Sequence, residues 1–392
     1  MAFETKQAGL GAPVVVFLAV AAAWGTSAIY PLQPAIAEVA AALGVSVAAV
    51  GFALAGGPLG YLAGLALVVP LIDQMPARRL LSVQFGALAA MLAASAVAGS
   101  VWLLGGAMVL IGAASSVGAA LSSLAGRLAA PGRRATVLGA VTAGISAGIL
   151  AGRMVGGWLA DAVGWRGTLV TLAVGCAALA VAALLIPAVA PNASSGYLGT
   201  LRSMPGLWRH FPALRLAAVR GALWFFAFCA VWAGVAVALS QPPYSLSAER
   251  IGWYAAAGLL GIVATRVAGA WTDRFGARRV ILGGLALAAA AALVLGVALP
   301  SVVATVLALA LFDAGLFAAQ VANQSTVLAL DPGAPARFNS AYMVVYFVGG
   351  SAGTAFGAAA VTWFGWPLTA LLAAGAIGAA MVMTRADDTA SC

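Results

Sequence analysis

The stretch that decides the fold is Asp273-Arg-Phe-Gly-Ala-Arg278-Arg279, a short charged turn between two long apolar runs. A similar turn, Asp73-Gln-Met-Pro-Ala-Arg78-Arg79, occurs 200 positions earlier and also separates two apolar runs. The runs are about twenty residues long, which is the length that an α-helix needs to cross the hydrocarbon core of a bilayer. This spacing predicts a chain built from two copies of one membrane-spanning unit.

The composition supports a membrane protein over its whole length. Of 392 residues, 64% are hydrophobic and only 7% are charged, whereas a soluble domain carries about 25% charged residues. Soluble catalytic folds are therefore excluded. The runs are rich in glycine, alanine, leucine and valine and lack the alternation of a transmembrane barrel, so the predicted fold class is all-α integral membrane.

Turn residues and charges divide the chain into twelve predicted spans. The first six are expected near residues 13–37, 46–72, 80–99, 101–126, 135–160 and 167–188. The second six are expected near residues 215–240, 250–272, 280–299, 301–329, 338–363 and 366–384. The sequence thus predicts an N-terminal six-helix bundle over 1–188, a polar cytoplasmic linker over 189–214 and a C-terminal six-helix bundle over 215–392.

The net charge of +9 is explained by where the basic residues lie. If the N-terminus is cytoplasmic, the basic residues between the spans fall on the cytoplasmic side, with Arg166 and Arg250 as the exceptions. This is the bias of the positive-inside rule, so no nucleic acid partner is needed. We expect a multi-pass protein of the cell membrane, a bacterial inner membrane, with both termini in the cytoplasm.

Two ladders of glycine reinforce the repeat. One ladder lies in the fifth span and its counterpart lies in the eleventh, and their members are Gly144, Gly148, Gly152 and Gly156, then Gly349, Gly353 and Gly357. Glycine at every fourth position leaves a flat helix face that a neighbouring backbone can approach closely. Two parallel six-helix units of this kind predict pseudo-symmetric bundles around a central binding site.

With these motifs the sequence resembles the major facilitator superfamily, and within it the efflux branch of twelve-span drug and metabolite:proton antiporters. The Asp273–Arg279 turn fits the loop motif of that superfamily, and Gly148-Ile-Leu-Ala-Gly152-Arg153-Met-Val-Gly156-Gly157 occupies the place of the antiporter motif in the fifth span. There are departures: Arg153 replaces the usual proline, and the fourth span lacks the arginine often used in proton coupling.

The resemblance implies a secondary active transporter that works by alternating access and exports small amphiphilic drugs or metabolites in exchange for protons. Two alternatives stay open: a transporter, for uptake or export, of a small organic anion bound by membrane-embedded arginines, and a non-transporting membrane receptor or assembly factor. The expected partners are a small-molecule substrate and the lipid bilayer. A monomer is the superfamily default.

Charges inside the membrane point to the site, because each costs at least about 2.5–3.5 kcal/mol at a helix centre. Asp313 lies about twelve residues into its span, roughly 18 Å at 1.5 Å per residue, and so near the midplane. Desolvation favours the neutral form of a carboxyl, and we expect Asp313 to be the proton-coupling residue. The alternative is a permanently ionised structural partner of a nearby arginine.

The expected substrate cavity combines aromatic and polar side chains. Phe317, Gln320 and Gln324 follow Asp313 on one helical face, and the resemblance places spans 1, 4, 7 and 10 around the cavity. The other candidates are Trp24, Tyr30, Gln33, Ser115, Ser116, Trp224, Phe228, Trp232, Asn339, Tyr342 and Tyr346. For the aromatic residues the alternative is contact with lipid or packing, and for those of the eleventh span it is closure of the interface with the second.

Further charges are candidates for gating. Arg153 and Arg266 lie within spans: Arg153 is expected to gate or to bind an anion, and Arg266 has surface exposure as its alternative. The loop residues, which could pin the turns across the interdomain seam or only set topology, are Asp73, Arg78, Arg79, Asp273, Arg278 and Arg279. Glu38 and Asp161 fall near external ends and are expected to be solvated.

Several chemistries are not indicated by the sequence. The single histidine, His210, has no metal-ligand cluster around it, so no metal site is expected. The chain lacks a phosphate-binding loop ending in Lys-Ser or Lys-Thr, which excludes direct use of ATP. No nucleophile and base share a depth in the membrane, so no enzyme is expected. We therefore predict no cofactor, with the proton gradient as the energy source.

Overall fold

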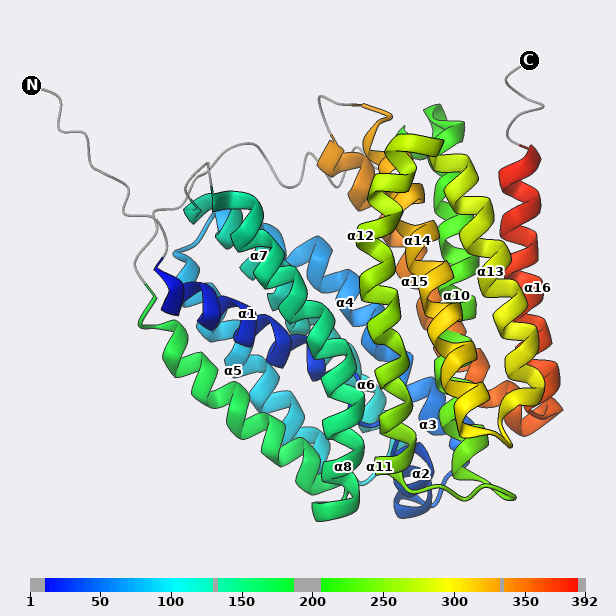
Figure 1. Ribbon diagram of the computed structural model, residues 1–392. Helices are drawn as coiled ribbons and strands as arrows, with labels where there is room; N and C mark the ends of the chain where they lie inside the picture. The colour runs from blue at the N-terminus through cyan, green and yellow to red at the C-terminus, as the bar shows by residue number, and fades with distance from the viewer. Residues whose placement is uncertain (1–10, 130–132, 187–205, 332–334, 387–392) are drawn as a thin grey trace, which may run out of the picture.

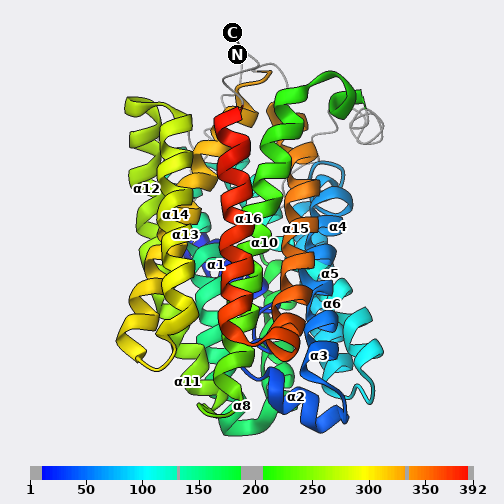
Figure 2. The ribbon, with the colours of Figure 1, turned by 90° about the vertical axis from the view of Figure 1, so that its right-hand side faces the viewer.

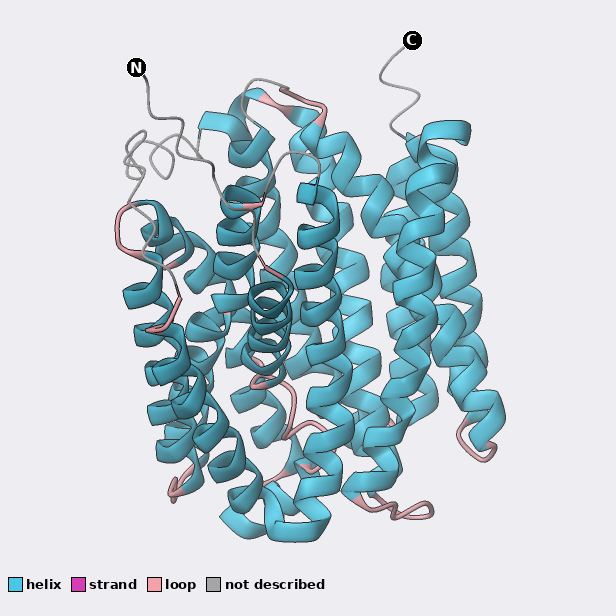
Figure 3. Cartoon of the chain, turned by 60° about the vertical axis from the view of Figure 1, so that its left-hand side comes forward, coloured by secondary structure: helices cyan, strands magenta, loops and turns pink. Residues whose placement is uncertain are grey.

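The computed structural model describes residues 11–129, 133–186, 206–331 and 335–386, and every regular element in them is a helix (Figure 3). The first half contains α1 (Ala12–Ser27), α2 (Ile36–Leu43), α3 (Val47–Leu54), α4 (Gly56–Leu67), η1 (Val69–Asp73), α5 (Ala77–Ala96), α6 (Val101–Ser115), α7 (Val117–Leu128) and α8 (Arg134–Ala183). The second half contains α10 (Pro212–Ser240), α11 (Ala248–Trp253), η3 (Tyr254–Ala257), α12 (Gly258–Phe275), α13 (Ala277–Ala298), α14 (Val302–Leu328), α15 (Pro335–Phe364) and α16 (Trp366–Ala386).

Twelve membrane crossings account for these helices. Ten helical runs of the described residues are long and apolar enough to cross a membrane. One of them, within α8, is part of a helix of 50 residues, or about 75 Å, more than twice the hydrocarbon thickness of about 30 Å. Gly164, with φ of 74°, breaks α8 into two crossings. The shorter apolar helix α1 supplies the remaining crossing, so the predicted all-α integral membrane fold is confirmed.

The polar stretch between the two halves is only partly described. Residues 187–205 lie outside the described part of the chain, so most of the predicted linker does as well. Residues 206–210 are helical, and α10 begins at Pro212, slightly before the predicted start of the seventh span. Proline suits this place because the first turn of a helix leaves its backbone N–H groups without helical partners.

The glycine ladders pack helices of the same bundle together. A Cβ added to Gly144 would lie 2.2 Å from the carbonyl oxygen of Ala19 in α1, and one added to Gly353 would lie 2.2 Å from that of Phe226 in α10. Larger residues at these places would therefore push α8 away from α1, and α15 away from α10. The ladders fix the first helix of each bundle against the fifth.

The two bundles meet more closely at one end than at the other. Figure 1 shows α8 and α12 converging beside α11 and diverging toward the opposite end. We call the first the Asp161 end, where α2, α11 and the Gly164 turn lie, and the second the Arg278 end, where α13 begins and α16 stops (Figure 2). At the Asp161 end a Cβ on Gly157 would lie 2.2 Å from the carbonyl oxygen of Ala248, which belongs to the other bundle.

Candidate functional site

Three charged side chains of the described residues are buried inside the protein. Arg153 is 4% exposed, Arg220 is 5% exposed and Asp313 is 2% exposed. Arg153 lies on α8 of the N-terminal bundle, whereas Arg220 and Asp313 lie on α10 and α14 of the C-terminal bundle. Burial of a charge is costly unless other groups stabilise it, so the surroundings of each one matter.

Arg153 is held by residues of both bundles. Its Nε donates a hydrogen bond to Oε1 of Gln33 at 2.8 Å. Its guanidinium carbon lies 4.8 Å from the ring centroid of Tyr30 and 4.7 Å from that of Trp232. Cation–π contacts of this kind contribute about 0.5–2 kcal/mol each, most where water is excluded. The guanidinium therefore lies in an aromatic slot formed by Tyr30 and Trp232.

The chain that follows α1 supplies two of these contacts. α1 ends at Ser27, and the backbone runs through turns until α2 begins at Ile36. Non-helical backbone at membrane depth is tolerated where it is buried in protein or lines a cavity. The turns bring Tyr30 and Gln33 to Arg153, and Pro31 packs on Gly156 of the glycine ladder, where an added Cβ would lie 2.5 Å from Cα of Pro31.

Trp232 connects Arg153 to Asp313. The indole Nε1 donates a hydrogen bond to Oδ1 of Asp313 at 3.1 Å, while the face of the same ring contacts Arg153. Arg153, Trp232 and Asp313 form what we call the charge cluster, and both of its charged residues belong to the part of the chain that the structure describes. The cluster joins the two charges through an indole ring, without a direct ion pair, and it spans both bundles.

Glycine residues of α12 make room for Asp313. A Cβ added to Gly258 would lie 3.2 Å from Oδ2 of Asp313, and one added to Gly261 would lie 2.6 Å from Cδ2 of Phe317. The carboxyl is thus enclosed by the α12 backbone on one side and by Trp232 on the other. This enclosure leaves space for a proton at Oδ2 but not for a bulky head group.

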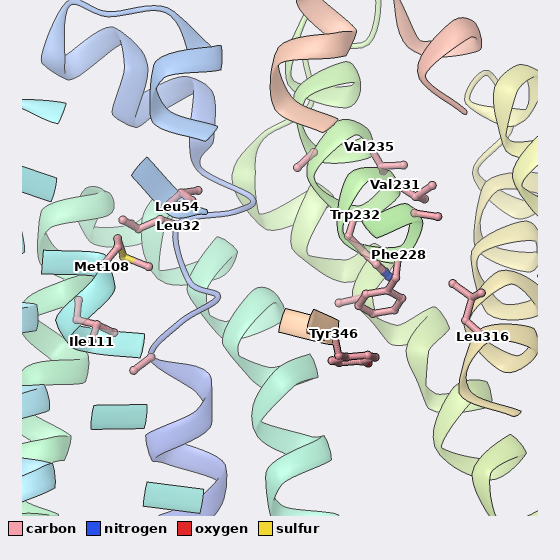
Figure 4. Close-up of a cluster of buried hydrophobic side chains, with 14 of the residues drawn as sticks. Leu32, Leu54, Met108, Ile111, Phe228, Val231, Trp232, Val235, Leu316 and Tyr346 are labelled. Atoms are coloured by element: carbon pink, nitrogen blue, oxygen red, sulfur yellow. The ribbon is translucent and has the colours of Figure 1, made fainter. Parts of the chain in front are cut away.

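Aromatic rings continue from the charge cluster into the C-terminal bundle. Phe317 packs edge-to-face on Phe228 with centroids 5.7 Å apart, and Phe225 stacks on Tyr346 at 4.0 Å. Trp224 contacts Tyr346 at 5.0 Å. Figure 4 shows Phe228, Trp232 and Tyr346 opposite a second apolar group of Leu32, Leu54, Met108 and Ile111. The interior between the bundles is therefore largely apolar around the two charges.

Other predicted cavity residues bond to each other inside the C-terminal bundle. The hydroxyl of Tyr342 donates to Oε1 of Gln320 at 2.6 Å, and Nε2 of Gln324 donates to Oδ1 of Asn339 at 2.8 Å. These bonds join α14 to α15 through residues of the face predicted from Asp313 to Gln324. The physical reason is that buried amides need partners, and α15 supplies them.

A second buried network was not anticipated from the sequence. Nε of Arg220 donates to Oδ1 of Asn323 at 2.9 Å, and Nδ2 of Asn323 donates to the carbonyl oxygen of Ala217 at 2.9 Å. Arg220 also donates to the hydroxyl of Thr384 at 3.4 Å. The sequence does contain a signal, because Arg220 lies four residues before Trp224. Its position near the end of the predicted span is equally compatible with a place at the membrane surface.

Three predicted cavity residues pack within the N-terminal bundle instead. The indole Nε1 of Trp24 donates to the carbonyl oxygen of Leu172 at 3.2 Å, which places Trp24 between α1 and the second half of α8. Ser115 and Ser116 are fully buried, and Oγ of Ser116 accepts a bond from Nε2 of Gln84 at 3.4 Å. Trp24 and Ser116 are thus held by hydrogen bonds within the bundle, whereas the buried hydroxyl of Ser115 has no hydrogen-bond partner among the described residues.

The predicted gating residues lie at the Arg278 end. Arg278 donates to the carbonyl oxygens of Thr384 and Arg385 at 3.3 Å and 3.4 Å, where α16 ends, so it contacts its own bundle in this conformation. Arg78, Arg79, Asp273 and Arg279 are exposed, and the side chain of Asp73 lies outside the described part. Arg266 is exposed on α12 and joins no hydrogen bond of the described residues, so it lies outside the charge cluster.

Acidic residues at the Asp161 end act as helix caps. Oδ1 and Oδ2 of Asp161 accept bonds from the backbone N–H groups of Ala248 and Glu249, both at 3.1 Å. Oε1 of Glu38 accepts from the N–H of Trp165 at 3.2 Å. Both residues are exposed, as expected, and they also cap helices, because unpaired N–H groups at a helix start attract carboxylates. Asp161 thereby ties the N-terminal bundle to α11 of the other.

A cavity of about 480 Å³ lies beside these caps. Its lining includes Pro34, Glu38, Asp161, Ser240 and Ser247. It borders the turns that carry Tyr30 and Gln33 toward the charge cluster. The Asp161 end thus holds a cavity, with acidic and hydroxyl side chains in its lining, next to the contact between α8 and α11.

Comparisons with known proteins agree with this architecture. The family model described as Major Facilitator Superfamily matches residues 15–245. The uncharacterized transporter YgaY of Escherichia coli O157:H7 is 31% identical over 361 residues, covering 91% of this chain and 91% of that protein. The probable transporter SCO4007 of Streptomyces coelicolor is 34% identical over 236 residues, covering 60% of this chain and 55% of that protein.

Solved structures share the fold at low sequence identity. The nucleoside transporter NupG has a TM-score of 0.79 at 13% identity, covering 95% of this chain and 98% of that one. A bacterial homolog of the human lysosomal transporter Spinster, in an inward-facing and unoccupied conformation, has a TM-score of 0.75 at 15% identity, covering 95% and 93%. From the match of the family model and the relative aligned over nine-tenths of its length, this chain belongs to the Major Facilitator Superfamily of multi-pass membrane transporters.

Proposed function

We propose that this chain is a proton-coupled secondary active transporter that works by alternating access, with Asp313 as its proton site. The observation that carries the proposal is the charge cluster, in which the one buried carboxyl of the described residues is linked to a buried arginine of the other bundle. A carboxyl that accepts one hydrogen bond and has no direct ion pair can change its protonation state during a transport cycle.

The cluster gives a route from protonation to movement. A hydrogen bond to an ionised carboxylate is about twice as strong as one to a neutral group, so a proton on Asp313 weakens the bond from Trp232. The ring that contacts Arg153 is then held less firmly. Because Arg153 belongs to the other bundle, this loosens one of the contacts that hold the two bundles in their present arrangement.

The resemblance favours one form of this coupling, the export of small amphiphilic drugs or metabolites by antiport. In that form a neutral or cationic substrate and the proton exclude each other from the cavity, and the gradient sets the direction. A specific observation favours a second form, the transport of an organic anion, because Arg153 is buried in the aromatic slot. A receptor or assembly factor without transport has no comparable use for a buried acid between moving bundles.

We base the proposed membrane and orientation of the transporter on the sequence. The positive-inside bias favours a bacterial inner membrane with both termini in the cytoplasm, so that the Arg278 end faces the cytoplasm and the Asp161 end faces outward. A monomer without a cofactor, driven by the proton gradient, completes the proposal.

The test uses proteoliposomes with an imposed pH gradient. Wild type, Asp313→Asn and the control Glu249→Gln are compared for proton movement linked to a panel of cationic, neutral and anionic compounds. We expect linked proton movement in wild type and in Glu249→Gln, and its loss in Asp313→Asn. Proton-linked transport that survives in Asp313→Asn would leave Asp313 as a structural partner and would refute the proposed proton site.

A further inference from the structure

We infer that the substrate is an organic anion that binds the guanidinium of Arg153 and crosses the membrane together with the proton on Asp313. This inference rests on the proposed proton site and names the class of substrate and the sign of the coupling. It starts from the different hydrogen bonding of the two charges of the cluster.

Asp313 has no room for a cationic head group. Oδ1 accepts the bond from Trp232 at 3.1 Å, and Oδ2 faces Gly258, where even an added Cβ would lie 3.2 Å away. Only 2% of the residue is exposed. A proton can reach such a carboxyl through small rearrangements, but a substrate cation would have to displace α12 or Trp232.

Arg153 has the opposite character. Its Nε donates a hydrogen bond to Gln33, while its two η nitrogens form no hydrogen bond with any described residue, although the residue is only 4% exposed. A guanidinium offers five N–H donors in a planar fork that matches a carboxylate, phosphate or sulfonate. Four of these donors therefore lack a hydrogen-bond partner among the described residues, and a bound anion would accept hydrogen bonds from them.

A cationic substrate would compete with Arg153 for the aromatic slot. The aromatic slot of Tyr30 and Trp232 is the part of the cluster suited to a cation, and the guanidinium of Arg153 already occupies it. A cationic substrate would have to expel a buried arginine and leave it without its aromatic partners. An anion instead adds a charge opposite to that of Arg153, with Phe228 and Phe317 nearby to contact an apolar body.

The electrostatics then fix the sign of the coupling. While Asp313 is ionised, its charge balances Arg153 and repels a second anion. Once Asp313 is protonated, the charge of Arg153 is left without that balance and an anion binds more tightly. By thermodynamic reciprocity the bound anion favours the proton on Asp313 by the same factor. Proton and anion therefore bind together and move in the same direction, whereas a cation would move against the proton.

Binding to the purified full chain in detergent tests this. The probes are benzenesulfonate, naphthalene-2-sulfonate and octanesulfonate, each with an ammonium compound of the same apolar body, and ligand-induced thermal stabilisation is measured at pH 5.5 and pH 7.5. Sulfonates stay ionised at both pH values, so any pH dependence comes from the protein. We expect at least one sulfonate to bind about tenfold more tightly at pH 5.5, within the usual range of coupling.

Variants separate the two charges. Asp313→Asn mimics the protonated carboxyl, so it should bind the sulfonate at pH 7.5 as tightly as wild type does at pH 5.5, without pH dependence. Arg153→Gln should abolish binding at both pH values, and Arg153→Lys, which keeps the charge, guards against a folding defect. Arg274→Gln, which removes an exposed arginine of α12, is the matched control and should bind like wild type.

The outcomes distinguish this inference from the proposed function. Binding of ammonium compounds that weakens at pH 5.5, or absence of binding by every sulfonate, would overturn the inference while proton coupling at Asp313 could still be measured in proteoliposomes. Sulfonate binding that needs Arg153 but keeps its pH dependence in Asp313→Asn would instead refute Asp313 as the proton site.

Discussion

Trp232 matters at the residue scale because its ring has two chemically different surfaces. The π face carries negative potential and contacts the Arg153 guanidinium, and the N–H edge is a donor that reaches Asp313. No other natural side chain combines a large aromatic face with a donor at this position relative to the ring. The residue therefore relates two opposite charges without letting them meet.

Replacing Trp232 by phenylalanine should separate these two contributions. The Trp232→Phe variant keeps an aromatic face for Arg153 but loses the hydrogen bond to Asp313, and bonds to charged groups contribute about 1.5–3 kcal/mol. We expect proton-driven transport in proteoliposomes to fall about tenfold or more, since tenfold corresponds to about 1.4 kcal/mol. Trp224→Phe, at an aromatic neighbour outside the cluster, is the control, and equal rates in both variants would contradict a role for the N–H group.

Only some of the predicted site residues come together in the structure. The sequence singles out the three residues of the charge cluster together with Tyr30, Gln33 and Phe317, and the structure places these three beside the cluster. Trp24, Gln320, Gln324 and Asn339 share the same composition but bond inside their own bundles. Polar type and helical face do not distinguish these fates, because the partner that satisfies each polar group lies on a distant helix.

At the scale of elements, glycine decides which helices can touch. The ladder on α15 brings its backbone within contact of Phe226 and Ala230 of α10, as the ladder on α8 does for α1. Pairs of helices in membranes are stabilised by close packing rather than by exclusion of water. The fixed pairs α1 with α8 and α10 with α15 hold the helices of each bundle together.

A single methyl group should be enough to weaken one of these pairs. In Gly353→Ala the new Cβ would lie 2.2 Å from the carbonyl oxygen of Phe226, and overpacking of this kind costs about 1–3 kcal/mol. We expect a lower thermal unfolding temperature in detergent. The matched control is Gly378→Ala on α16, where nothing lies within 4 Å of an added Cβ, and where alanine should be neutral or stabilising. Equal losses in both variants would show that the ladder is not a packing face.

At the scale of the whole molecule, the contacts between the bundles are unevenly distributed. Asp161 caps the start of α11 across the interface, and Oγ of Ser351 donates to the carbonyl oxygen of Ala55 at 2.5 Å. The Asp161 contact lies at the end where α8 and α12 converge (Figure 1), whereas the Ser351 contact joins α15 to the junction of α3 and α4. Alternating access would require the Asp161 contact to break when the opposite end closes.

Removing the charge of Asp161 should shift this equilibrium. Asparagine has one acceptor oxygen where aspartate has two, so Asp161→Asn loses one bond to α11 and the favourable charge at a helix start, together about 1 kcal/mol. We expect the fraction of molecules whose bundles are separated at the Asp161 end to rise about fivefold. This factor follows from a loss of about 1 kcal/mol when RT is about 0.59 kcal/mol. Spin labels at exposed Ala162 and Arg250, in a chain without Cys176, Cys229 and Cys392, would measure the distance distribution. If the Asp161→Asn variant had the same distance distribution as the wild type, Asp161 would have no role in closing this end.

The sequence by itself determined the membrane class, the number of crossings and the duplicated bundles. These properties depend on local composition and on repeats along the chain, because a bilayer requires each apolar run of about twenty residues to form its own hydrogen bonds as a helix. It also indicated which rare charges merit attention. A charge within an apolar run is costly wherever the helix packs, and that cost can be read without knowing the neighbours.

Only the tertiary structure decided how these residues are combined. The turns after α1, the place of Trp232 between Arg153 and Asp313, and the cap that Asp161 forms on α11 each join segments more than 80 positions apart. A cation–π contact or a hydrogen bond requires a separation of a few ångströms and a defined direction. Spacing along one helix fixes the face on which a side chain lies, but packing between helices fixes what that side chain meets.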